Sequence, residues 1–324
     1  MYMVTIFDDP PDAVQADLDS LSDQLNADIP VKQDDNLLIA TWNLRAFSSL
    51  TRKFTARSTD SPKRDLRGLR AIIEIISRFD VIALQEVQGN LRALRDTMRF
   101  LGDEWAFLMT DVTGGDGGNS ERLAFVFHRT RCRPSGLAAE LVVPPERLGS
   151  MSEGVLREQF ARTPYAVSFQ RADTTFILVT LHILFGEVAA DRVPELQEIA
   201  DWMFAWARRT NRFEQNLLTL GDFNIDDREG PLFEAFTSTG LTVPDVLNNL
   251  PRTIFDDPDD PSDDNFYDQI AWFTTGSEAL INMKLRDGGN FDFLPHVYTD
   301  LNLTRNSISF RISDHFPLWV EFEI

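Results

Sequence analysis

Short apolar runs alternate along the chain with segments in which apolar residues recur every three or four positions. The runs predict buried or half-buried strands, and they are LLIATW (37–42), DVIAL (80–84), LAFVF (123–127), YAVSF (165–169), TFILVTL (175–181), LLTL (217–220), QIAWF (269–273) and FPLWVEF (316–322). The periodic segments, at 65–79, 91–101 and 194–207, predict helices. Strands and helices mix without a long linker, so we expect one α/β or α+β domain over residues 36–324.

The first 35 residues follow a different pattern. Apolar residues at helical spacing predict a short amphipathic helix over residues 13–25, and they are Val14, Leu18, Leu21 and Leu25. This segment is either an extension packed on the outside of the domain, which we favour, or a helix that binds a partner. The N-terminus has no basic region before an apolar core, and no stretch approaches the roughly 18 apolar residues that span a bilayer, so we expect neither a secretory signal nor membrane insertion.

Composition and charge narrow the choice of protein class only a little. The chain has 324 residues and a net charge of −20. This acidity argues against a nucleic-acid partner held through phosphate contacts, but a bound metal ion can supply the positive charge that such a partner needs. The single cysteine, Cys132, excludes an internal disulfide and fits a reducing compartment, so we expect a cytoplasmic protein. The oligomeric state is left open.

Two stretches have an unusual concentration of charge. Residues 45–70 contain Asp60 and Asp65 against eight basic residues, which are Arg45, Arg52, Lys53, Arg57, Lys63, Arg64, Arg67 and Arg70. This basic stretch either attracts phosphate or is a solvated loop and helix face, and the sequence leaves both open. Residues 256–264, DDPDDPSDD, contain six Asp at a spacing that matches no EF-hand, so we expect a mobile acidic loop there.

Polar side chains with catalytic potential lie at the ends of six predicted strands. They are Asn43, Gln85-Glu86, His182, Asp222 with Asn224, Asp268, and Asp314-His315. Each has an ordinary explanation when taken alone, such as an Asx turn, a capping glutamate or a satisfied core histidine. Strand ends in layered sheet folds converge on one rim, however, so the six together indicate a polar site.

Eight motifs in order resemble the endonuclease/exonuclease/phosphatase superfamily. They are ATWNLRAF, ALQEVQ, ERLAFVF, RTPYAVSF, LVTLH, LGDFN, YDQI and ISDHFP. The resemblance covers the chain from about Leu37 onward and is greatest to the branch of pancreatic-type deoxyribonuclease. It implies a four-layer sandwich, in which two mixed β-sheets pack face to face with helices outside. It also implies a metal-dependent phosphodiesterase acting on DNA with low specificity, or alternatively on a phosphoinositide, sphingomyelin or a small phosphoester.

The resemblance assigns the metal to Glu86, with Asn43 and Asp314 in support. A carboxylate is a hard oxygen ligand of the kind that Mg²⁺, or Mn²⁺, takes. Asn224 would donate its amide to the phosphate, and Arg162 would contact phosphate, although a surface ion pair is an equally ordinary role for that arginine.

The resemblance also assigns the acid–base groups. His182 would pair with Glu121 and His315 with Asp268, one imidazole activating water and the other assisting the leaving group, with the order left open. Asp222 would orient the water or a second metal. A catalytically inactive scaffold would have lost one of these positions, and none is lost, so we disfavour that interpretation.

Two positions depart from the deoxyribonuclease pattern. Gln88 stands where that branch has an arginine that enters the minor groove, and Asn119 stands where it has a stacking tyrosine. The loop after Asn43 is also longer. We therefore expect this basic loop to replace the lost contacts and bind substrate, through Arg45, Arg52 and Lys53.

Overall fold

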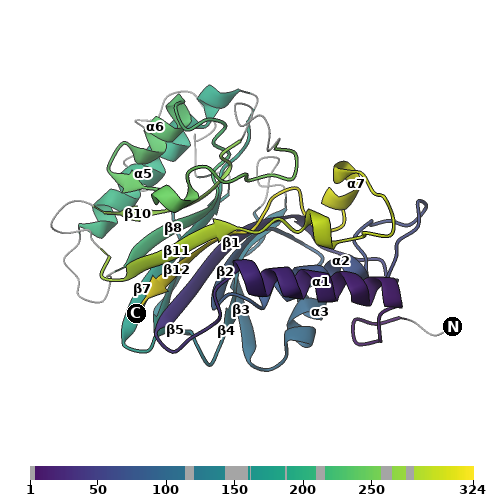
Figure 1. Ribbon diagram of the computed structural model, residues 1–324. Coiled ribbons are helices and arrows are strands. Elements are labelled where there is room, and N and C mark those ends of the chain that lie inside the picture. The colour runs from purple at the N-terminus through teal and green to yellow at the C-terminus, as the bar shows by residue number, and fades with distance from the viewer. Residues whose placement is uncertain are drawn as a thin grey trace.

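Two mixed sheets packed face to face make up the middle of the molecule (Figure 1). The structure is a computed structural model that describes residues 4–113, 120–142, 160, 162–186, 188–208, 216–256, 265–274 and 281–324. Within these residues each sheet has six strands, and helices cover their outer faces. The predicted four-layer sandwich is confirmed.

The first sheet has the strand order β11-β12-β1-β2-β4-β3. Its strands are β1 (Asn36–Phe47), β2 (Val81–Gln88), β3 (Trp105–Met109), β4 (Glu121–His128), β11 (Lys284–Asn290) and β12 (Leu318–Glu323). β1 runs parallel to β2 and antiparallel to β12, so the sheet is mixed.

The second sheet has the order β5-β6-β7-β8-β10-β9. Its strands are β5 (Arg133–Glu140), β6 (Tyr165–Arg171), β7 (Thr174–His182), β8 (Leu217–Asp222), β9 (Leu241–Thr242) and β10 (Asp268–Phe273). β8 runs parallel to β7 and antiparallel to β10. In each sheet the two central strands run parallel, so their carboxyl ends, which carry candidate catalytic residues, lie side by side.

Alternation along the strands of the first sheet separates two cores. In β1, Leu37 and Ile39 pack into the core between the sheets, together with Phe125 and Phe169. Trp42, an even-numbered residue of the same strand, faces the opposite way into the core beneath the helices. This period of two is the expected signature of a strand with both faces buried.

The helices lie outside the two sheets (Figure 1). They are α1 (Asp12–Asp28), α2 (Leu66–Ile76), α3 (Arg92–Leu101), α5 (Val193–Ala207), α6 (Pro231–Thr237) and α7 (Arg305–Ser309), with 3-10 turns at Ala189–Asp191, Asp245–Leu247 and Leu294–His296. Each of the four helices predicted from periodicity is present. None of the helices in the described residues has the length and apolar character needed to cross a membrane.

The N-terminal helix α1 packs against α2 (Figure 1). Its Asp17 is buried and accepts hydrogen bonds from Arg67 (Nε–Oδ2, 3.0 Å) and Thr299 (Oγ1–Oδ1, 2.6 Å). Arg67 also pairs with Asp300 at 2.7 Å. The segment is thus the packed extension, and a partner for its exposed face stays a prediction.

Four strands went unpredicted from the sequence pattern: β3, β5, β9 and β11. All four lie at the edges of their sheets. The residues of β5 and β11 are mostly exposed or half-buried, because an edge strand that faces water needs little apolar alternation. The acidic loop predicted at 256–264 lies, beyond residue 256, outside the described residues.

Candidate active site

Strand register places three catalytic candidates side by side at one end of the second sheet. β7 and β8 pair His182 with Asp222, and β8 and β10 pair Asp222 with Asp268. On the first sheet, the pairing of β1 with β2 sets Asn43 beside the strand end that carries Glu86. The Asn43 amide donates to Asp222 (Nδ2–Oδ2, 2.9 Å) and so joins the ends of the two sheets.

The strands of the first sheet are irregular where they reach this site. The register of β1 shifts between Asn43 and Phe47, and that of β2 shifts around Glu86. Glu86 has φ 60°, which a residue with a Cβ rarely adopts. Amides fix both of its carboxylate oxygens, from the Ala46 backbone (2.7 Å) and the Asn43 side chain (3.1 Å). A bulge of this kind redirects a side chain, and here it directs the carboxylate toward the second sheet.

Asp222 lies at the centre of the site. Its Oδ2 is 3.5 Å from His182 Nε2, 3.9 Å from His315 Nε2 and 2.9 Å from the Asn43 amide. Burial by itself would raise the pKa of Asp222, but the two imidazoles outweigh it and lower the pKa below its ordinary value. Asp222 therefore stays ionised although only 2% of its surface is exposed.

Gly221 allows the strand to reach this position. Its φ is 147°, in the region that favours glycine. A Cβ on this residue would lie 2.1 Å from the Leu181 carbonyl oxygen of the neighbouring strand. The glycine before Asp222 is therefore required by the close pairing of β7 with β8.

The first predicted imidazole–carboxylate pair is present in the structure. His182 Nδ1 lies 2.9 Å from Glu121 Oε1. Arg162 Nε contacts the same oxygen, and Arg162 Nη1 donates to the Ile183 carbonyl at 3.2 Å. Burial opposes a charge on His182, but the Glu121 hydrogen bond and Asp222 outweigh it and raise the pKa of the imidazole. Nε2 is left facing Asp222.

The second predicted pair is also present. His315 Nδ1 lies 2.6 Å from Asp268 Oδ2, and the Trp42 indole donates to the His315 carbonyl at 2.8 Å. Burial raises the pKa of Asp268 to about 6. Burial also opposes a charge on His315, but the carboxylates of Asp268 and Asp222 outweigh it and raise the pKa well above its ordinary value.

Glu86 is the side chain best suited to hold a divalent cation. Burial opposes its charge, but the nearby imidazoles, chiefly His182, and the two amides lower its pKa. It forms no ion pair with another described residue, so its negative charge is not directly balanced. Glu86, Glu121 and His182 each offer a ligand atom, all within 4.8 Å of one another. Glu121 and His182 already bind each other, so the donor set fits a Mg²⁺ or Mn²⁺ ion held by Glu86.

Several predicted residues have contacts that differ from their expected roles. Asp314, expected near the metal, pairs with Arg45 at 2.8 Å and lies outside the group of possible ligands. Asn43 uses its amide nitrogen to hold two carboxylates. Asn224 donates one amide hydrogen to the Ile183 carbonyl (2.6 Å), which leaves the second for a substrate.

Most of the predicted substrate-binding cations form ion pairs with other residues of the protein. Arg162 is buried behind His182, with 8% of its surface exposed, so it supports the imidazole and does not present its charge to solvent. Arg52 pairs with Asp96 at 3.0 Å and Lys53 with Asp60 at 2.7 Å. Neither contacts the residues that surround Asp222. Asn119 lies outside the described residues.

Two further residues belong to the site but were missed in the sequence. Tyr267 has its ring centroid 5.8 Å from that of His315, and its position directly before Asp268 in the motif YDQI was an available signal. Arg192 donates to the Asn224 backbone carbonyl and pairs with Asp226 at 2.6 Å. No sequence pattern indicated that contact, because it depends on the approach of α5 to the loop after β8.

The chain matches the endonuclease/exonuclease/phosphatase family over residues 40–315. It therefore belongs to this family, whose members hydrolyse phosphoesters and phosphodiesters and generally depend on a divalent metal, and it is an enzyme of that class. A curated relative from Thioalkalivibrio sp. (strain K90mix), described as a deoxyribonuclease, is 27% identical over 267 residues. That match covers 78% of this chain and 65% of the relative, so the chain spans about two thirds of the relative's length.

Solved structures share the fold at low sequence identity. An endonuclease/exonuclease/phosphatase family protein from Bacteroides thetaiotaomicron has a TM-score of 0.57 at 19% identity, covering 89% of this chain and 97% of that one. A mannosyl-6-phosphatase from the same species has 0.56 at 17%, covering 89% and 100%. TDP2 from D. rerio, complexed with a single-strand DNA product, has 0.57 at 12%, covering 89% and 99%. At these identities the likeness shows the fold alone.

Proposed function

We propose that this enzyme is a divalent-metal-dependent phosphodiesterase that cleaves DNA with low sequence specificity. One observation carries the proposal: an ionised Asp222 lies between two imidazoles, at 3.5 and 3.9 Å, and each imidazole is oriented by its own carboxylate. Two fixed imidazoles around one carboxylate are suited to a dianion-like transition state that forms between them. An ion pair with a purely structural role would need only one histidine–carboxylate pair.

The residues divide the work of hydrolysis among them. Each histidine uses Nδ1 to bind a carboxylate and turns Nε2 toward the site, and the surrounding carboxylates raise the pKa of both rings, which favours their protonated forms. The rings can therefore donate to the phosphoryl oxygens, and one of them can protonate the leaving oxygen. Asp222, ionised, orients the attacking water and takes up the proton that the water loses as it attacks the phosphorus. A divalent cation held by Glu86 would neutralise developing negative charge on the phosphate.

Two substrate classes remain to be separated by experiment. The relative described as a deoxyribonuclease supports DNA. The alternative is a small phosphoester, phosphoinositide or sphingomyelin, and the structural likeness to a mannosyl-6-phosphatase is compatible with it.

A plasmid-nicking assay with Mg²⁺ or Mn²⁺ tests the proposal. We expect the wild type to nick supercoiled DNA, and we expect Asp222→Asn and His182→Gln each to lower the rate by at least about a hundredfold, the scale of acid–base groups. His296→Gln is the matched control, since His296 binds Ser20 at the surface, away from the site. Parallel assays on inositol phosphates and on bis(4-nitrophenyl) phosphate identify the substrate class.

The outcomes distinguish three cases: a nuclease, an enzyme for small phosphoesters, and a wrongly assigned site. Nicking by the wild type with loss in both site variants supports a nuclease. Hydrolysis of the small esters without nicking supports the alternative. Near-normal rates in both site variants would show that the site is misplaced.

We also propose that the protein works in the cytoplasm. Cys132, the single cysteine, is buried and its thiol has a pKa raised by burial, so it offers no disulfide that an oxidising compartment would use. Cell fractionation with a specific antibody tests this, and recovery from the extracellular medium would contradict it.

A further inference from the structure

A cavity of about 390 Å³ opens beside Glu86, between the loop after β1 and the end of β2. Ala46 lines the cavity and donates its backbone amide to Glu86. Gln88, the last residue of β2, lines it two positions beyond Glu86. The cavity therefore adjoins the group that would hold the metal, at the low end of the roughly 300–1,000 Å³ range of ligand pockets.

A buried cation without a carboxylate partner lies beneath this cavity. Arg64 is 2% exposed, and all three of its guanidinium nitrogens donate to carbonyl oxygens, which are those of Leu44 (2.7 Å), Arg45 (2.8 Å), Ala46 (2.8 Å), Ile312 (2.9 Å) and Arg311 (3.3 Å). Like Arg162 it does not present its charge to solvent, so it adds positive potential beneath the cavity and does not bind a ligand directly. Among the described residues, no carboxylate forms an ion pair with it. Burial lowers the pKa of Arg64 to about 10, so it remains charged at neutral pH. An unpaired buried charge costs stability, which a bound anion would offset.

A second unpaired cation lines the cavity. The Lys63 ammonium donates to the carbonyls of Arg57 (3.2 Å), Ser58 (2.6 Å) and Asp60 (2.7 Å), and no described carboxylate pairs with it. Arg45, by contrast, is neutralised by Asp314. The lining contains no acidic residue, so the cavity is a local region of positive charge in a chain of net charge −20.

The remaining lining groups suit a nucleotide. Ser48, Ser49 and Ser61 supply hydroxyl donors for phosphate oxygens, and Gln88 supplies an amide for a base edge. Phe310 is 47% exposed, and the Arg45 guanidinium covers one face of its ring at 4.1 Å from the centroid, so a base can stack only on the opposite face.

We propose that this cavity binds the nucleotide that flanks the scissile phosphate, with that nucleotide unpaired and its own phosphate beside Lys63, above the buried charge of Arg64. The inference rests on the proposed function and deepens it, since it assigns the substrate as a strand with a second phosphate next to the cleaved one. The serine-lined loop and its two unpaired cations thus contribute the phosphate recognition that Arg52 and Lys53 do not.

The test measures what a second phosphate adds to the rate. The substrates are the thymidine dinucleotide TpT, the same dinucleotide with a phosphate on its 5′ or on its 3′ end, and bis(4-nitrophenyl) phosphate. We expect one of the two end phosphates to raise kcat/KM over TpT by at least about tenfold in the wild type, which corresponds to about 1.4 kcal/mol. Single-stranded oligonucleotides should also be cleaved faster than the matched duplex.

Lys63→Met and Ser49→Asp test whether the gain comes from this cavity. Lys63→Met removes one cation. Ser49→Asp keeps the Lys63 hydrogen bonds and adds a carboxylate, so it answers the question even where the first variant loosens its loop. We expect both to lose most of the gain while their rates on bis(4-nitrophenyl) phosphate change little. Lys284→Met is the matched control, since Lys284 is exposed on β11 and pairs with Glu323.

Three results would overturn the inference: no gain from either end phosphate, a gain that persists in both cavity variants as in Lys284→Met, or a preference for duplex over single strands. Each leaves hydrolysis of bis(4-nitrophenyl) phosphate intact. Absence of hydrolysis of all phosphodiesters would instead reject the proposed function, so the two failures are distinguishable.

Discussion

The Asp222 carboxylate is ionised because of the side chains around it. A carboxyl with 2% of its surface exposed would ordinarily become protonated more easily, but the imidazoles of His182 and His315 and the Asn43 amide stabilise the carboxylate. The dependence is mutual, because Asp222 also raises the pKa of both rings. The three side chains therefore form one coupled charge cluster, and a change in one alters the protonation of the others.

Replacing Glu121 tests this coupling. Glu121→Gln keeps the shape of the side chain and removes its negative charge, so we expect the pKa of His182 to fall, since the Glu121 hydrogen bond is one of the contacts that raise it. The pH below which the rate depends on a protonated His182 should fall with it. NMR titration of the four histidine rings measures this. An unchanged pKa of His182 would contradict the assignment.

At the scale of the element, the end of β8 depends on a single glycine. A Cβ at Gly221 would lie 2.1 Å from a backbone oxygen of β7, which cannot move without breaking the strand pair. We expect Gly221→Ala to lower the free energy of unfolding by at least about 2 kcal/mol, from backbone strain of about 1–3 kcal/mol and the clash, and to reduce activity.

Gly89→Ala is the control for this change, since nothing lies within 4 Å of a Cβ there. Urea unfolding should show it within about 0.5 kcal/mol of the wild type. Equal stability for the two alanine variants would contradict the role of Gly221.

The pattern of apolar residues predicted the buried elements and missed the exposed ones. β1, β2, β7 and β8 were found because both of their faces are buried and each contains a run of mostly apolar residues. β11, with the sequence KLRDGGN, lies beside β12 at the edge of the sheet and has no apolar face to detect. Bulges such as that around Glu86 were also unpredictable, because they depend on pairing between distant strands.

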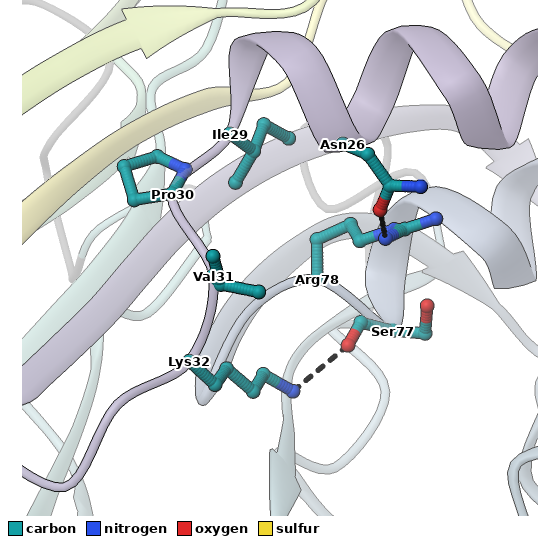
Figure 2. A pocket seen from close by; sticks show the side chains of 7 residues that line it. All are labelled: Asn26, Ile29, Pro30, Val31, Lys32, Ser77 and Arg78. Atoms are coloured by element: carbon teal, nitrogen blue, oxygen red, sulfur yellow. Dashed lines mark hydrogen bonds between the residues drawn. The ribbon is translucent and has the colours of Figure 1, made fainter.

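A second cavity, of about 410 Å³, lies between the end of α1 and the end of α2 (Figure 2). Figure 2 shows the Lys32 ammonium turned toward the Ser77 carbonyl, with which it makes a 2.8 Å hydrogen bond. Burial lowers the pKa of Lys32 from 10.5 to about 8. Between these two pH values the unfolded chain binds more protons at Lys32 than the folded chain does, so stability should rise with pH in this window.

Lys32→Met isolates this effect. The free energy of unfolding of the wild type, minus that of Lys32→Met, should increase as the pH rises from about 8 to about 10.5. Urea unfolding at pH 7, 8, 9 and 10 measures the difference. A difference that stays flat or falls with pH would show that Lys32 is not desolvated in the fold.

At the scale of the whole molecule, the N-terminal extension belongs to the same structural unit as the sandwich. The buried carboxylate of Asp17 binds Arg67 of α2 as well as Thr299 and the Tyr298 amide, from the segment that precedes α7. Removing Asp17 would leave Arg67 with Asp300 as its remaining carboxylate. It would also leave the Tyr298 amide and the Thr299 hydroxyl without this acceptor. The extension is therefore held by polar contacts as well as by the apolar face of α1.

Asp17→Ala should lower the free energy of unfolding by about 3–5 kcal/mol. Asp19→Ala, on the exposed face of the same helix, should change it by no more than about 0.5 kcal/mol. Urea unfolding of the two variants distinguishes a structural extension from a loosely attached one, and equal stabilities would contradict the structural role.

The residues of the site were predictable to the extent that they occur in motifs. The key residues lie at strand ends, and both the polar pattern and the family resemblance predicted a site there. They are Glu86, His182, Asp222, Asp268 and His315. Which cations of the basic stretch form ion pairs was not predictable. Arg52, Lys53 and Arg67 differ from Lys63 and Arg64 only in which carboxylates the folded chain brings to them. Counting charges along a sequence cannot separate a paired cation from an unpaired one.

The most direct test of the account is the position of the metal. Crystals soaked in Mn²⁺ should show an anomalous-scattering peak about 2.1 Å from a Glu86 carboxylate oxygen, facing Asp222, and the peak should be absent in Glu86→Gln. A peak between Glu121 and His182 that persists in Glu86→Gln would contradict the account, because it would replace the acid–base pair at His182 with a metal site.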